Sequence, residues 1–383
     1  MTKEKLSDIA KVIDCKHRTP QYITEGIPVV SPGSISWGNI DLKSPTKRVS
    51  LEEYTSLMDH CIVEVGDLVM SRNQSIGIAS YVNTLDKFVL GQDTILIKSQ
   101  TCNSHFLFQI LQSSIVQNQI FKFSGGSTFS RINLKDIRKL QIPLPPLPEQ
   151  KKIATILTTW DEAIDKVQSL IDSKEEQKKG LMQRLLTGEQ RLAGFNEEWK
   201  EVRLGEVADK FKGKIVETNE ERKGKPYIGA SSFDGNFILF SESEKAVLCS
   251  EEDVLMLWDG ENAGKVTSGL NGIVSSTVCV FRTSNFVTGT FLYYKLNELN
   301  YLIRATRTGS GIPHVDKSLH KWLKFYIPNI QEQKAISEIL NQSQSEIDLL
   351  HQKKVQMELQ KKGLMQQLLT GKMRVTSSEK INN

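Results

Sequence analysis

Two long stretches of the chain carry apolar residues at alternating steps of three and four positions, flanked by Glu, Gln and Lys. This pattern is typical of the seam of a helix that packs against a second helix. Each stretch therefore predicts one long helix. The expected seam residues are Ile153, Leu157, Trp160, Ile164, Val167, Ile171, Leu181 and Leu185 in the first stretch, and Ile336, Leu340, Ile347, Leu350, Met357, Leu364 and Leu368 in the second.

Polar residues interrupt both seams. Lys174 and Lys178 stand at seam positions in the first stretch, and Ser343, Lys354 and Lys361 stand there in the second. A helix lying on the core of its own domain explains any one seam fairly well. Two seams of matching register favour pairing of the two helices with each other as a coiled coil. We expect this pairing to be weaker near Ser343.

Prolines and glycines predict where the helices begin and end. Four prolines within residues 143–148 exclude helix before residue 149, and Pro328 has the same effect before the second stretch. Gly188 and Gly371 follow the two stretches, at the place of a C-terminal glycine cap.

The two helical stretches are copies of each other. Residues 178–188 (KKGLMQRLLTG) return as residues 361–371 (KKGLMQQLLTG). We call the difference between these starting numbers, 361 − 178, the repeat offset. The same offset pairs the Glu-Gln-Lys triplets at 149–151 and 332–334. The chain therefore consists of two tandem units, with a period far longer than that of a solenoid repeat.

The order of the elements predicts how the helices run. Repeats that pair with themselves are usually related by a two-fold axis, so the two helices should be antiparallel. About 38 residues at about 1.5 Å of rise give a spacer of roughly 57 Å, which is about a turn and a half of B-DNA. Gly180 and Gly363 recur inside the helices, where glycine costs about 1 kcal/mol relative to alanine. We expect close approach of the partner helix there, with another subunit as the alternative.

The remaining residues form two globular regions, at 1–143 and about 197–326, that resemble each other in outline. Leu6–Ala10 parallels Leu204–Ala208, and Asp67–Met70 parallels Asp253–Met256. Short segments of strand character alternate with turn residues, and helical patterns occur near 104–119 and 290–302. The expected strands include Cys61–Val65, Ile95–Ile97, Thr277–Phe281 and Lys324–Ile327.

We therefore predict an α+β fold in which two similar globular domains of mixed helices and strands are separated by an antiparallel coiled coil, with pseudo-two-fold symmetry. The expected boundaries are a first domain at 1–143, a helix at 144–188, a linker at 189–201, a second domain at 202–326, a helix at 327–371 and a tail at 372–383.

Composition changes this picture little. The 383 residues are 39% hydrophobic and 25% charged, as in an ordinary globular protein, and the formal charge of +4 permits a polyanionic partner without requiring one. No apolar run is long enough to span a bilayer and the start lacks a signal peptide, so we expect a cytoplasmic protein. Five cysteines without a CxxC pair favour reduced thiols over a disulfide or metal framework.

Segments that resemble catalytic motifs lack residues or a structural setting that those motifs require. Gly260–Val266 resembles a phosphate loop, but it is one residue short and has Val where Ser or Thr must hold magnesium. The Glu-x-Lys triplets at 149–151, 176–178 and 332–334 have the spacing of a nuclease metal site, but they fall on predicted helix and we interpret them as solvated flanks. The six histidines show no metal spacing. We expect a protein without an active site.

Polar loops occur at matching places in the two halves. They are rich in Arg, Asn, Gln, Ser and Lys, the side chains that reach base edges and phosphates. A solvated surface loop is the simpler interpretation of any one of them, and their recurrence favours a binding surface. The loops are 31–39, 71–75 and 124–135 in the first half, and 230–236, 258–265 and 307–317 in the second.

Together, the segments 144–151 and 327–334, the helix ends 178–188 and 361–371, and the two divergent halves resemble the specificity subunits of type I restriction–modification enzymes. The resemblance covers essentially the whole chain. It implies that each half is a target-recognition domain for one half of a bipartite, asymmetric site in double-stranded DNA. The helices would form the spacer that sets the gap between the half-sites and would dock the methyltransferase subunits.

The resemblance also implies the partners. Two modification subunits would bring S-adenosylmethionine and methylate adenine, and two ATP-driven restriction subunits would join them. This chain would bind no cofactor itself, since S-adenosylmethionine, ATP and magnesium would belong to the partners. The DNA-contact candidates taken from the loops are Ser71, Arg72, Asn73, Gln74, Ser127, Thr128, Ser130 and Arg131 for one half-site, and Ser231, Ser232, Trp258, Asn262, Lys265, Ser310 and His314 for the other.

Two other classes of protein stay open. A coiled-coil scaffold whose two domains bind peptides or glycans is compatible with the composition, but it does not explain the repeated helix sequence. A stand-alone methyltransferase or nuclease is disfavoured by the missing motifs. A neighbouring gene for an adenine methyltransferase would favour the specificity subunit over both.

Overall fold

The computed structural model describes residues 1–125, 131–309 and 311–375. Residue contacts divide the chain into two compact units. The first unit combines Met1–Ser169 with the chain from Gln352 onward, and the second unit is Leu170–His351. Each unit thus contains one variable half and part of each long helix. Within the described residues, no helix is long and apolar enough to cross a membrane.

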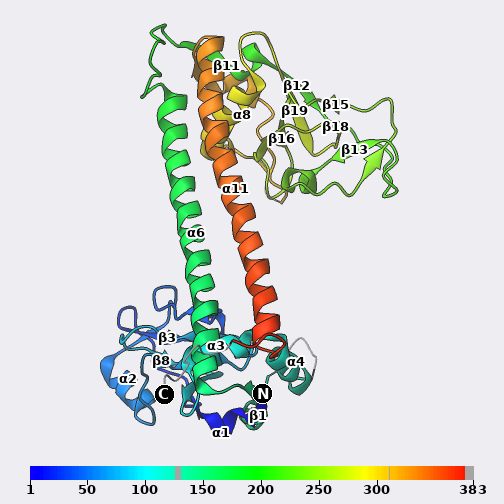
Figure 1. Cartoon of the computed structure of the whole chain (residues 1–383). Helices are drawn as coiled ribbons and strands as arrows, with labels where there is room; N and C mark the ends of the chain where they lie inside the picture. The colour runs from blue at the N-terminus through cyan, green and yellow to red at the C-terminus, as the bar shows by residue number, and fades with distance from the viewer. Residues whose placement is uncertain (126–130, 310, 376–383) are drawn as a thin grey trace. The chain divides into compact units, whose positions relative to one another are not determined.

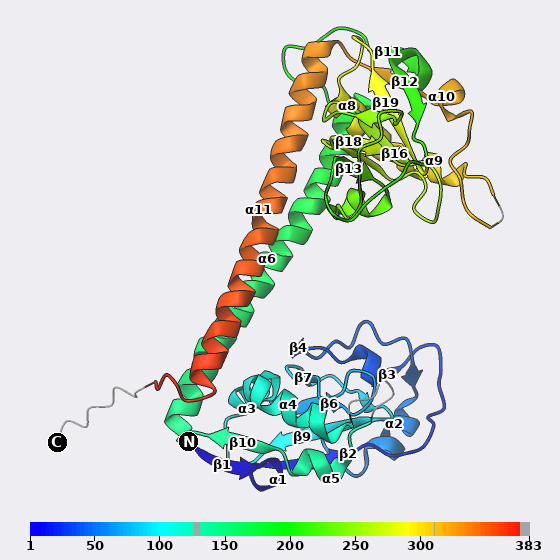
Figure 2. The ribbon, with the colours of Figure 1, turned by 90° about the vertical axis from the view of Figure 1, so that its right-hand side faces the viewer.

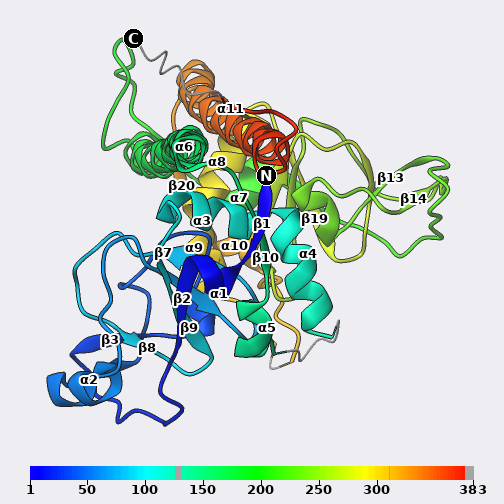
Figure 3. The ribbon, with the colours of Figure 1, turned by 60° about the horizontal axis from the view of Figure 1, so that its bottom comes forward.

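The first variable half contains two sheets and a separate strand pair (Figure 1). The larger sheet has the strand order β2-β9-β6-β7-β4, and the smaller one has the order β5-β3-β8. β1 pairs with β10 close to the N-terminus (Figure 3). The strands are β1 (Thr2–Lys5), β2 (Ala10–Asp14), β3 (Ile27–Val30), β4 (Gly38–Asn39), β5 (Arg48–Val49), β6 (Leu68–Ser71), β7 (Ala79–Tyr81), β8 (Val89–Leu90), β9 (Thr94–Ser99) and β10 (Gln141–Leu144). The helices are α1 (Leu6–Ile9), η1 (Pro32–Ser34), α2 (Leu51–Met58), α3 (Ser104–Gln112), α4 (Ser114–Phe123) and α5 (Leu134–Arg138).

The second variable half repeats this arrangement (Figure 2). Its sheets have the orders β12-β19-β16-β17 and β14-β13-β18-β15, and β11 pairs with β20. The strands are β11 (Lys200–Arg203), β12 (Ala208–Lys212), β13 (Lys225–Ile228), β14 (Phe240–Ser241), β15 (Leu248–Cys249), β16 (Val254–Leu257), β17 (Val266–Ser268), β18 (Gly272–Val274), β19 (Val278–Thr283) and β20 (Lys324–Ile327). The helices are α7 (Leu204–Val207), η2 (Ala230–Asp234), α8 (Gly289–Glu298), α9 (Asn300–Ala305) and α10 (Leu319–Trp322).

Strand register shows that the two halves share one framework. Met70 of β6 lies opposite Ile95 of β9, and Met256 of β16 lies opposite Cys279 of β19. Both halves also contain one matching parallel pair, β3 with β8 and β13 with β18. Every residue of β6 and β16 is buried, because apolar cores cover both faces of these strands. The predicted α+β fold with mixed sheets is confirmed.

One of the expected strands is wrong. The segments predicted at 95–97, 277–281 and 324–327 form the strands β9, β19 and β20 almost as expected. Cys61–Val65, in contrast, pairs with no strand, although Cys61 is buried. Ile62 and Val65 are largely exposed, whereas Cys61 and Val63 pack on the core, so this segment is half-buried without joining a sheet. The apolar pattern alone did not distinguish a strand from an extended surface segment.

The two long helices are α6 (Leu147–Thr187), with 41 residues, and α11 (Ile330–Leu368), with 39. α6 begins two residues earlier than expected, because Pro148 falls in the first turn, where proline is tolerated. Gly188 and Gly371 adopt φ angles of 76° and 75°, the left-handed conformation of a C-terminal cap. The predicted helix ends are confirmed at α6, and α11 ends two residues before the expected Thr370.

The helices are antiparallel within each unit. In the first unit Lys361 is bonded to Asp161 at 2.5 Å and Lys354 to Gln168 at 2.6 Å. An advance of seven residues along α6 therefore corresponds to a return of seven residues along α11. In the second unit Lys174 bonds Glu346 at 2.8 Å. Lysines that interrupt the seams therefore link the helices.

The fourth interrupting lysine behaves in the same way. Lys178 bonds Gln344 of α11. Lys178 is the repeat equivalent of Lys361, and Gln344 is the equivalent of Asp161, at the same repeat offset. The same cross-helix link is thus made twice, once to a carboxylate and once to an amide. Polar groups at such positions fix the register of paired helices.

None of the predicted seam residues is exposed, but the ends of the seams do not pack only on the other helix. Leu157 of α6 and Leu368 of α11 belong to the core of the first unit, and Leu185 and Leu340 belong to the core of the second. A helix lying on the core of its domain is thus the correct description of these ends. The buried seam residues are Ile153, Leu157, Ile171, Leu185, Ile336, Leu340, Ile347 and Leu368, and the half-buried ones are Trp160, Ile164, Val167, Leu181, Leu350, Met357 and Leu364.

The two helical glycines contradict one expectation. A Cβ atom added to Gly180 or to Gly363 would meet no atom within 4 Å, apart from the nearby backbone of its own helix. The partner helix therefore does not approach closely at either glycine. The expectation that these glycines serve the pairing of the two helices is wrong.

The cysteines are unpaired, as the sequence indicated. The structure describes all five, and each is free, with Cys102 half-buried and the others buried. Burial raises the pKa of Cys249 to about 11 and that of Cys279 to about 12. These thiols are therefore protonated packing residues.

Candidate nucleic-acid interface

The three polar loops predicted in the first half converge after the end of β6. The Ser75 hydroxyl donates to the Pro32 carbonyl at 3.0 Å, which ties loop 71–75 to loop 31–39. The Ile132 backbone N–H donates to the Arg72 carbonyl at 3.1 Å, which ties in the described end of loop 124–135. Polar loops joined in this way form one surface, which we call the first loop cluster.

Ion pairs organise the first loop cluster. The buried Arg72 donates from Nη1 to both carboxylate oxygens of Asp14, at 2.7 and 2.8 Å, and from Nε to the Ile132 carbonyl. Arg131 Nη2 lies 2.7 Å from Asp93 Oδ1 at the more exposed side. Burial opposes the charge on Asp14, but hydrogen bonds from His17 and Arg72 outweigh it and hold the pKa of Asp14 below its ordinary value. The cluster therefore holds its charges in fixed places at neutral pH.

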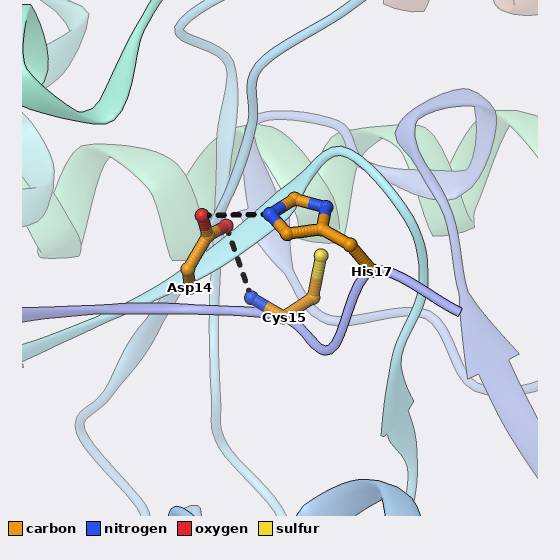
Figure 4. Close-up of side chains that lie close together, drawn as sticks. All are labelled: Asp14, Cys15 and His17. Carbon is orange, nitrogen blue, oxygen red and sulfur yellow. Dashed lines mark hydrogen bonds and ion pairs between the residues drawn. The ribbon is translucent and has the colours of Figure 1, made fainter.

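Asp14, Cys15 and His17 also bring three potential metal ligands within 4.8 Å of one another. Figure 4 shows the Asp14 carboxylate facing both the His17 ring and the Cys15 backbone N–H. Both oxygens of this carboxylate already accept from Arg72, a fixed cation. Burial also raises the pKa of the Cys15 thiol, which disfavours the thiolate that a metal needs. The donor set fits an ion-paired cluster better than a metal site.

Backbone strain concentrates in the first loop cluster. Only three non-glycine residues among those described have a positive φ, and two of them are Gln74 at 57° and Asp93 at 63°. Asn73 Oδ1 accepts from the Gln74 backbone N–H at 2.7 Å and supports this turn. Gln74 itself is exposed. Residues in sparsely populated conformations occur preferentially at binding and catalytic sites.

The polar loops of the second half converge in the same way after β16, and we call this surface the second loop cluster. The Val315 backbone N–H donates to the Trp258 carbonyl at 2.9 Å, and the Gly260 N–H donates to the Pro313 carbonyl at 2.9 Å. Lys265 forms an ion pair with a residue of loop 230–236, Asp234, at 2.5 Å. All three predicted loops thus meet here as well.

A carboxylate between a histidine and a lysine organises the second loop cluster. Asp259 lies 2.7 Å from His314 Nδ1 and 3.0 Å from Lys212 Nζ. Burial raises the pKa of Asp259, but the hydrogen bonds from His314 and Lys212 outweigh this effect and lower it overall. The buried Trp258 lies beneath Lys210, whose Nζ is 4.6 Å from the ring centroid. Cation, carboxylate and ring are therefore held together as one polar surface.

The two clusters occupy the same place in the shared framework. Arg72 and Trp258 each follow the strand at the centre of their sheet, and the carbonyl of each accepts from the equivalent residue, Ile132 or Val315. The side chains presented there differ completely between the halves. One framework therefore carries two chemically distinct polar surfaces.

Several predicted contact residues are buried and do not face solvent. Ser71, Arg72, Ser232 and Trp258 are 0%, 5%, 2% and 4% exposed. These side chains have almost no surface that DNA could contact in this conformation. The predicted residues that are exposed or half-buried are Asn73, Gln74, Arg131, Ser231, Asn262, Lys265 and His314. Ser127, Thr128, Ser130 and Ser310 lie outside the described residues.

Sequence analysis missed the residues that hold the clusters together. These are Asp14 and Asp93 in the first half, and Lys212 and Asp259 in the second. Asp14 and Lys212 are the last residues of β2 and β12. Each of these strands begins at the end of a matching segment, 6–10 or 204–208. A charged residue at the end of that strand in both halves was the available signal. Asp93 and Asp259 carried no comparable signal, since they lie at non-equivalent positions, just before β9 and just after β16.

The interpretation of the Glu-Gln-Lys triplets as solvated flanks is wrong for two of the three triplets. Glu149 and Glu332 are buried, and each holds an arginine through two hydrogen bonds. Arg374 donates to Glu149 at 2.7 and 2.6 Å, and Arg191 donates to Glu332 at 2.7 and 2.8 Å. The two arginines are separated by the repeat offset (374 − 191 equals 361 − 178), so the repeat conserves the whole clamp.

The neighbouring glutamines form a second conserved contact. Gln150 accepts from the Asn103 backbone N–H at 2.9 Å and donates to the Pro145 carbonyl at 2.8 Å. Gln333 likewise accepts from the Thr288 N–H at 2.9 Å and donates to a proline carbonyl at 2.9 Å. Each glutamine thus ties the start of a long helix to the start of a domain helix, α3 or α8.

A groove lies beside the long helices in each unit. The groove of the first unit, of about 700 Å³, is lined by Lys361, Lys362 and Met365 of α11 and by α3. The groove of the second unit, of about 590 Å³, is lined by the repeat equivalents on α6, at 178, 179 and 182, and by residues of α8 and α9. The helix side of the groove is therefore built from equivalent positions in both units, although Asp161 of the first groove is replaced by Gln344 in the second, and the domain side differs.

The chain matches a known protein family. The type I restriction modification DNA specificity domain matches residues 1–172 and again 196–359. The two matches together cover well over half of the chain and assign one copy to each repeat.

Relatives with curated names carry the same description. The MjaVIII specificity subunit of a type I restriction enzyme from Methanocaldococcus jannaschii is 34% identical over 180 residues, which are 45% of this chain and 42% of that protein. The putative MjaX specificity subunit from the same organism is 26% identical over 390 residues, which are 91% of this chain and 88% of that protein. The chain thus spans less than half of the first relative and most of the second.

Solved structures share the fold. The S subunit of a type I restriction–modification system from M. genitalium superposes with a TM-score of 0.63 at 17% identity, over 96% of this chain and 95% of that chain. A chain from a structure of type I R-M complex assembly superposes with a TM-score of 0.60 at 18% identity, over 97% and 98%. The duplicated arrangement of domains and long helices is therefore that of known S subunits.

Proposed function

Because the chain belongs to the family of type I restriction–modification DNA specificity proteins, we propose that it is the sequence-recognition subunit of such an enzyme and has no catalytic step of its own. One observation carries the proposal. The same framework presents two different polar loop clusters, one around Arg72 and Arg131 and the other around Trp258 and His314. A protein that reads two unlike half-sites needs this arrangement, whereas a scaffold for one repeated ligand would present the same residues twice.

The loop clusters supply the chemistry for reading double-stranded DNA. Arginine, asparagine, glutamine and histidine offer hydrogen bonds to base edges, and lysine offers contacts to phosphates. We assign the first half-site to Asn73, Gln74 and Arg131, which are exposed or half-buried. The residues assigned to the second half-site are Ser231, Asn262, Lys265 and His314.

The helices supply the spacer in this proposal. The lysine links at 174, 178, 354 and 361 fix the register of α6 against α11. A fixed register holds the length of the helical pair constant, and that length sets the gap between the half-sites. The target is then bipartite and asymmetric, with an unread segment between its halves.

The repeated helix surface is the docking site for two modification subunits. Lys179 and Lys362 are exposed equivalents, and they line the grooves of the second and first unit. Gly180 and Gly363 lie next to them with open space around them, which favours the alternative that another subunit approaches there. A surface that occurs twice with the same residues favours two copies of one partner.

The partners bring the chemistry. The modification subunits bind S-adenosylmethionine and methylate adenine, and two restriction subunits use ATP and magnesium.

The exposed parts of both loop clusters contact DNA in this proposal. The enzyme works in the cytoplasm, where the host DNA is located.

Adenine methylation in cells tests this proposal. The chain is expressed together with its modification subunit, and methylated adenines are mapped across the host genome. We expect a bipartite motif that disappears when the gene for this chain is deleted. A stable complex that methylates no defined motif would instead support a protein–protein scaffold.

A further inference from the structure

The geometry points to one base-reading side chain in each half. We propose that Arg131 and His314 contact base edges at equivalent places of the two half-sites, an inference that rests on the proposed function. Asp93 and Asp259 are then positioning residues that orient these two side chains.

Backbone contacts place the two side chains at the same point of the framework. The residue after Arg131 is Ile132, and the residue after His314 is Val315; both are fully buried. Each of these apolar anchors donates its N–H to the residue that follows the central strand, at 3.1 and 2.9 Å. Arg131 and His314 are also separated by the repeat offset, since 314 − 131 equals 361 − 178. They are therefore equivalent in structure and in sequence.

Each side chain is held by a carboxylate and is nearly half exposed. Arg131 Nη2 is 2.7 Å from Asp93 Oδ1, and His314 Nδ1 is 2.7 Å from Asp259 Oδ1. The Arg131 and His314 side chains are 46% and 44% exposed, while the two carboxylates are 24% and 20% exposed. The deeper carboxylate therefore orients the guanidinium or the imidazole ring through one nitrogen atom, and the side chain that it orients is the more exposed of the two.

The carboxylates are themselves fixed. Asp93 has a φ of 63°, and its carbonyl accepts from the Arg72 backbone N–H at 2.8 Å. Asp259 is bonded from its other oxygen by Lys212 at 3.0 Å. A carboxylate held by the framework can aim a neighbouring side chain, because it does not follow that side chain when it moves.

The free groups suit different base edges. The guanidinium of Arg131 has five donors and spends one on Asp93, so a pair of donors is left for O6 and N7 of a guanine in the major groove. Asp259 only accepts, so Nδ1 of His314 carries a proton and donates it, and Nε2 is left for a base edge. Two unlike side chains at one equivalent place give two half-sites that differ at one equivalent base pair.

A second ion pair at the opposite end of the same strands has a different character. Lys98 bonds Asp67 at 2.9 Å, and Arg282 bonds Asp253 at 3.1 Å, again at equivalent positions. Both carboxylates are buried and accept from a backbone N–H three residues earlier. The acidic residue is the same in both halves, so this end is a common scaffold and the end with Arg131 and His314 is the specific one.

The test measures discrimination between base pairs, with the full chain bound to its modification subunit. Binding is measured to a duplex that carries the methylated motif and to duplexes that differ from it by one base pair. For Arg131→Ala we expect discrimination at one base pair of the first half-site to fall about tenfold or more, since a good bidentate contact contributes about 1–3 kcal/mol. His314→Ala should do the same at one base pair of the second half-site only.

The positioning role has its own readout. Asp93→Gly removes the carboxylate and accepts the positive φ, whereas Asp93→Asn keeps both an acceptor and a residue that tolerates this φ. We expect Asp93→Gly to lose discrimination at the same base pair as Arg131→Ala, and Asp93→Asn to retain more of it. The double variant Asp93→Gly/Arg131→Ala should discriminate no worse than Arg131→Ala alone, because Asp93 acts through Arg131.

Matched controls separate the outcomes. Lys98→Ala and Arg282→Ala change the ion pairs at the opposite strand ends and should leave every base preference intact. The second half-site serves as an internal control for folding in each variant of the first.

An equal loss of affinity for all duplexes, with the slope of log affinity against log salt concentration reduced by about one unit, would make Arg131 a phosphate contact and overturn the inference. Unchanged discrimination in both alanine variants would overturn it too, whereas a wild-type complex without any motif would refute the proposed function itself.

Discussion

At the scale of single residues, the buried Glu and Gln at the start of each long helix join separate parts of a unit. Glu149 holds Arg374 and Gln150 holds the start of α3, while Glu332 holds Arg191 in the second unit. The glutamines of the two units are almost fully buried, with exposures of 2% in the first and 0% in the second. A buried polar group stabilises a fold only while all its partners are present.

The glutamines are therefore sensitive to truncation. Gln333→Ala removes the hydrogen-bond partner of three backbone groups, the Thr288 N–H and the carbonyls of Phe286 and Pro328. We expect the free energy of unfolding to fall by about 1–3 kcal/mol. Gln150→Ala should have a similar effect in the first unit. Hydrogen exchange by mass spectrometry should show loosening at the start of α8 in the one variant and of α3 in the other. The adjacent exposed lysines give the control, since Lys151→Ala and Lys334→Ala should change stability by less than about 0.5 kcal/mol. Equal effects of lysine and glutamine variants would contradict this account.

The clamp at Glu149 should depend on pH. The hydrogen bond from Arg374 lowers the pKa of Glu149, against the opposing effect of burial. A lowered pKa in the folded state gives stabilisation that is present above the ordinary carboxyl pKa and is lost as the pH falls through the folded value. We therefore expect Glu149→Gln to be less stable than wild type at pH 7, with the difference shrinking below about pH 4.

Thermal unfolding of both proteins across this pH range measures the difference. Other carboxylates titrate equally in the two proteins, so their contributions cancel. A difference that stays constant from pH 7 down to pH 3 would show that charge on Glu149 is not what stabilises the clamp.

Residue types in the loops predicted a polar surface, but not which side chains face solvent. Arg72 and Trp258 carry suitable chemistry for DNA, yet both are buried. Burial depends on contacts with distant segments, such as Asp14 for Arg72 and Lys210 for Trp258. No local pattern contains that information. Arg131 and His314 were among the predicted residues, but the carboxylates that hold them were not.

At the scale of elements, the lysines inside the helical seams explain how α6 and α11 are paired. A seam of apolar residues alone permits shifts by one heptad, whereas Lys361 on Asp161 and Lys354 on Gln168 match only in one register. The helix period was easy to predict because it repeats over many turns. The strand expected at 61–65 failed because a short apolar run has too few residues to define its period.

Lengthening the helices tests their role as a spacer. Inserting one matched heptad into both α6 and α11 keeps the seam in phase, because seven residues are two turns of a coiled coil. We expect the preferred gap between half-sites to increase while the half-site sequences stay the same. Methylation mapping of the variant reads out both quantities. A variant that still prefers the original gap would show that the helices do not set it.

At the scale of the whole molecule, duplication is the main feature of the chain. The near-identical helix ends, the two arginine clamps and the equivalent strand registers all recur at or close to the repeat offset. The repeat was predictable because the helix sequences are almost unchanged. The shared framework of the two halves was predictable only in outline, since their loops differ in length and their residues have diverged.

The central claim is that each half reads its own half-site, and one exchange tests it most directly. Residues 1–143 are replaced by the corresponding half of a family member, and adenine methylation is mapped in cells that express the hybrid with its modification subunit. We predict that one half of the bipartite motif changes, while the other half and the gap stay as they are. A hybrid that folds and methylates with the original motif, or one in which both halves of the motif change, would contradict the claim.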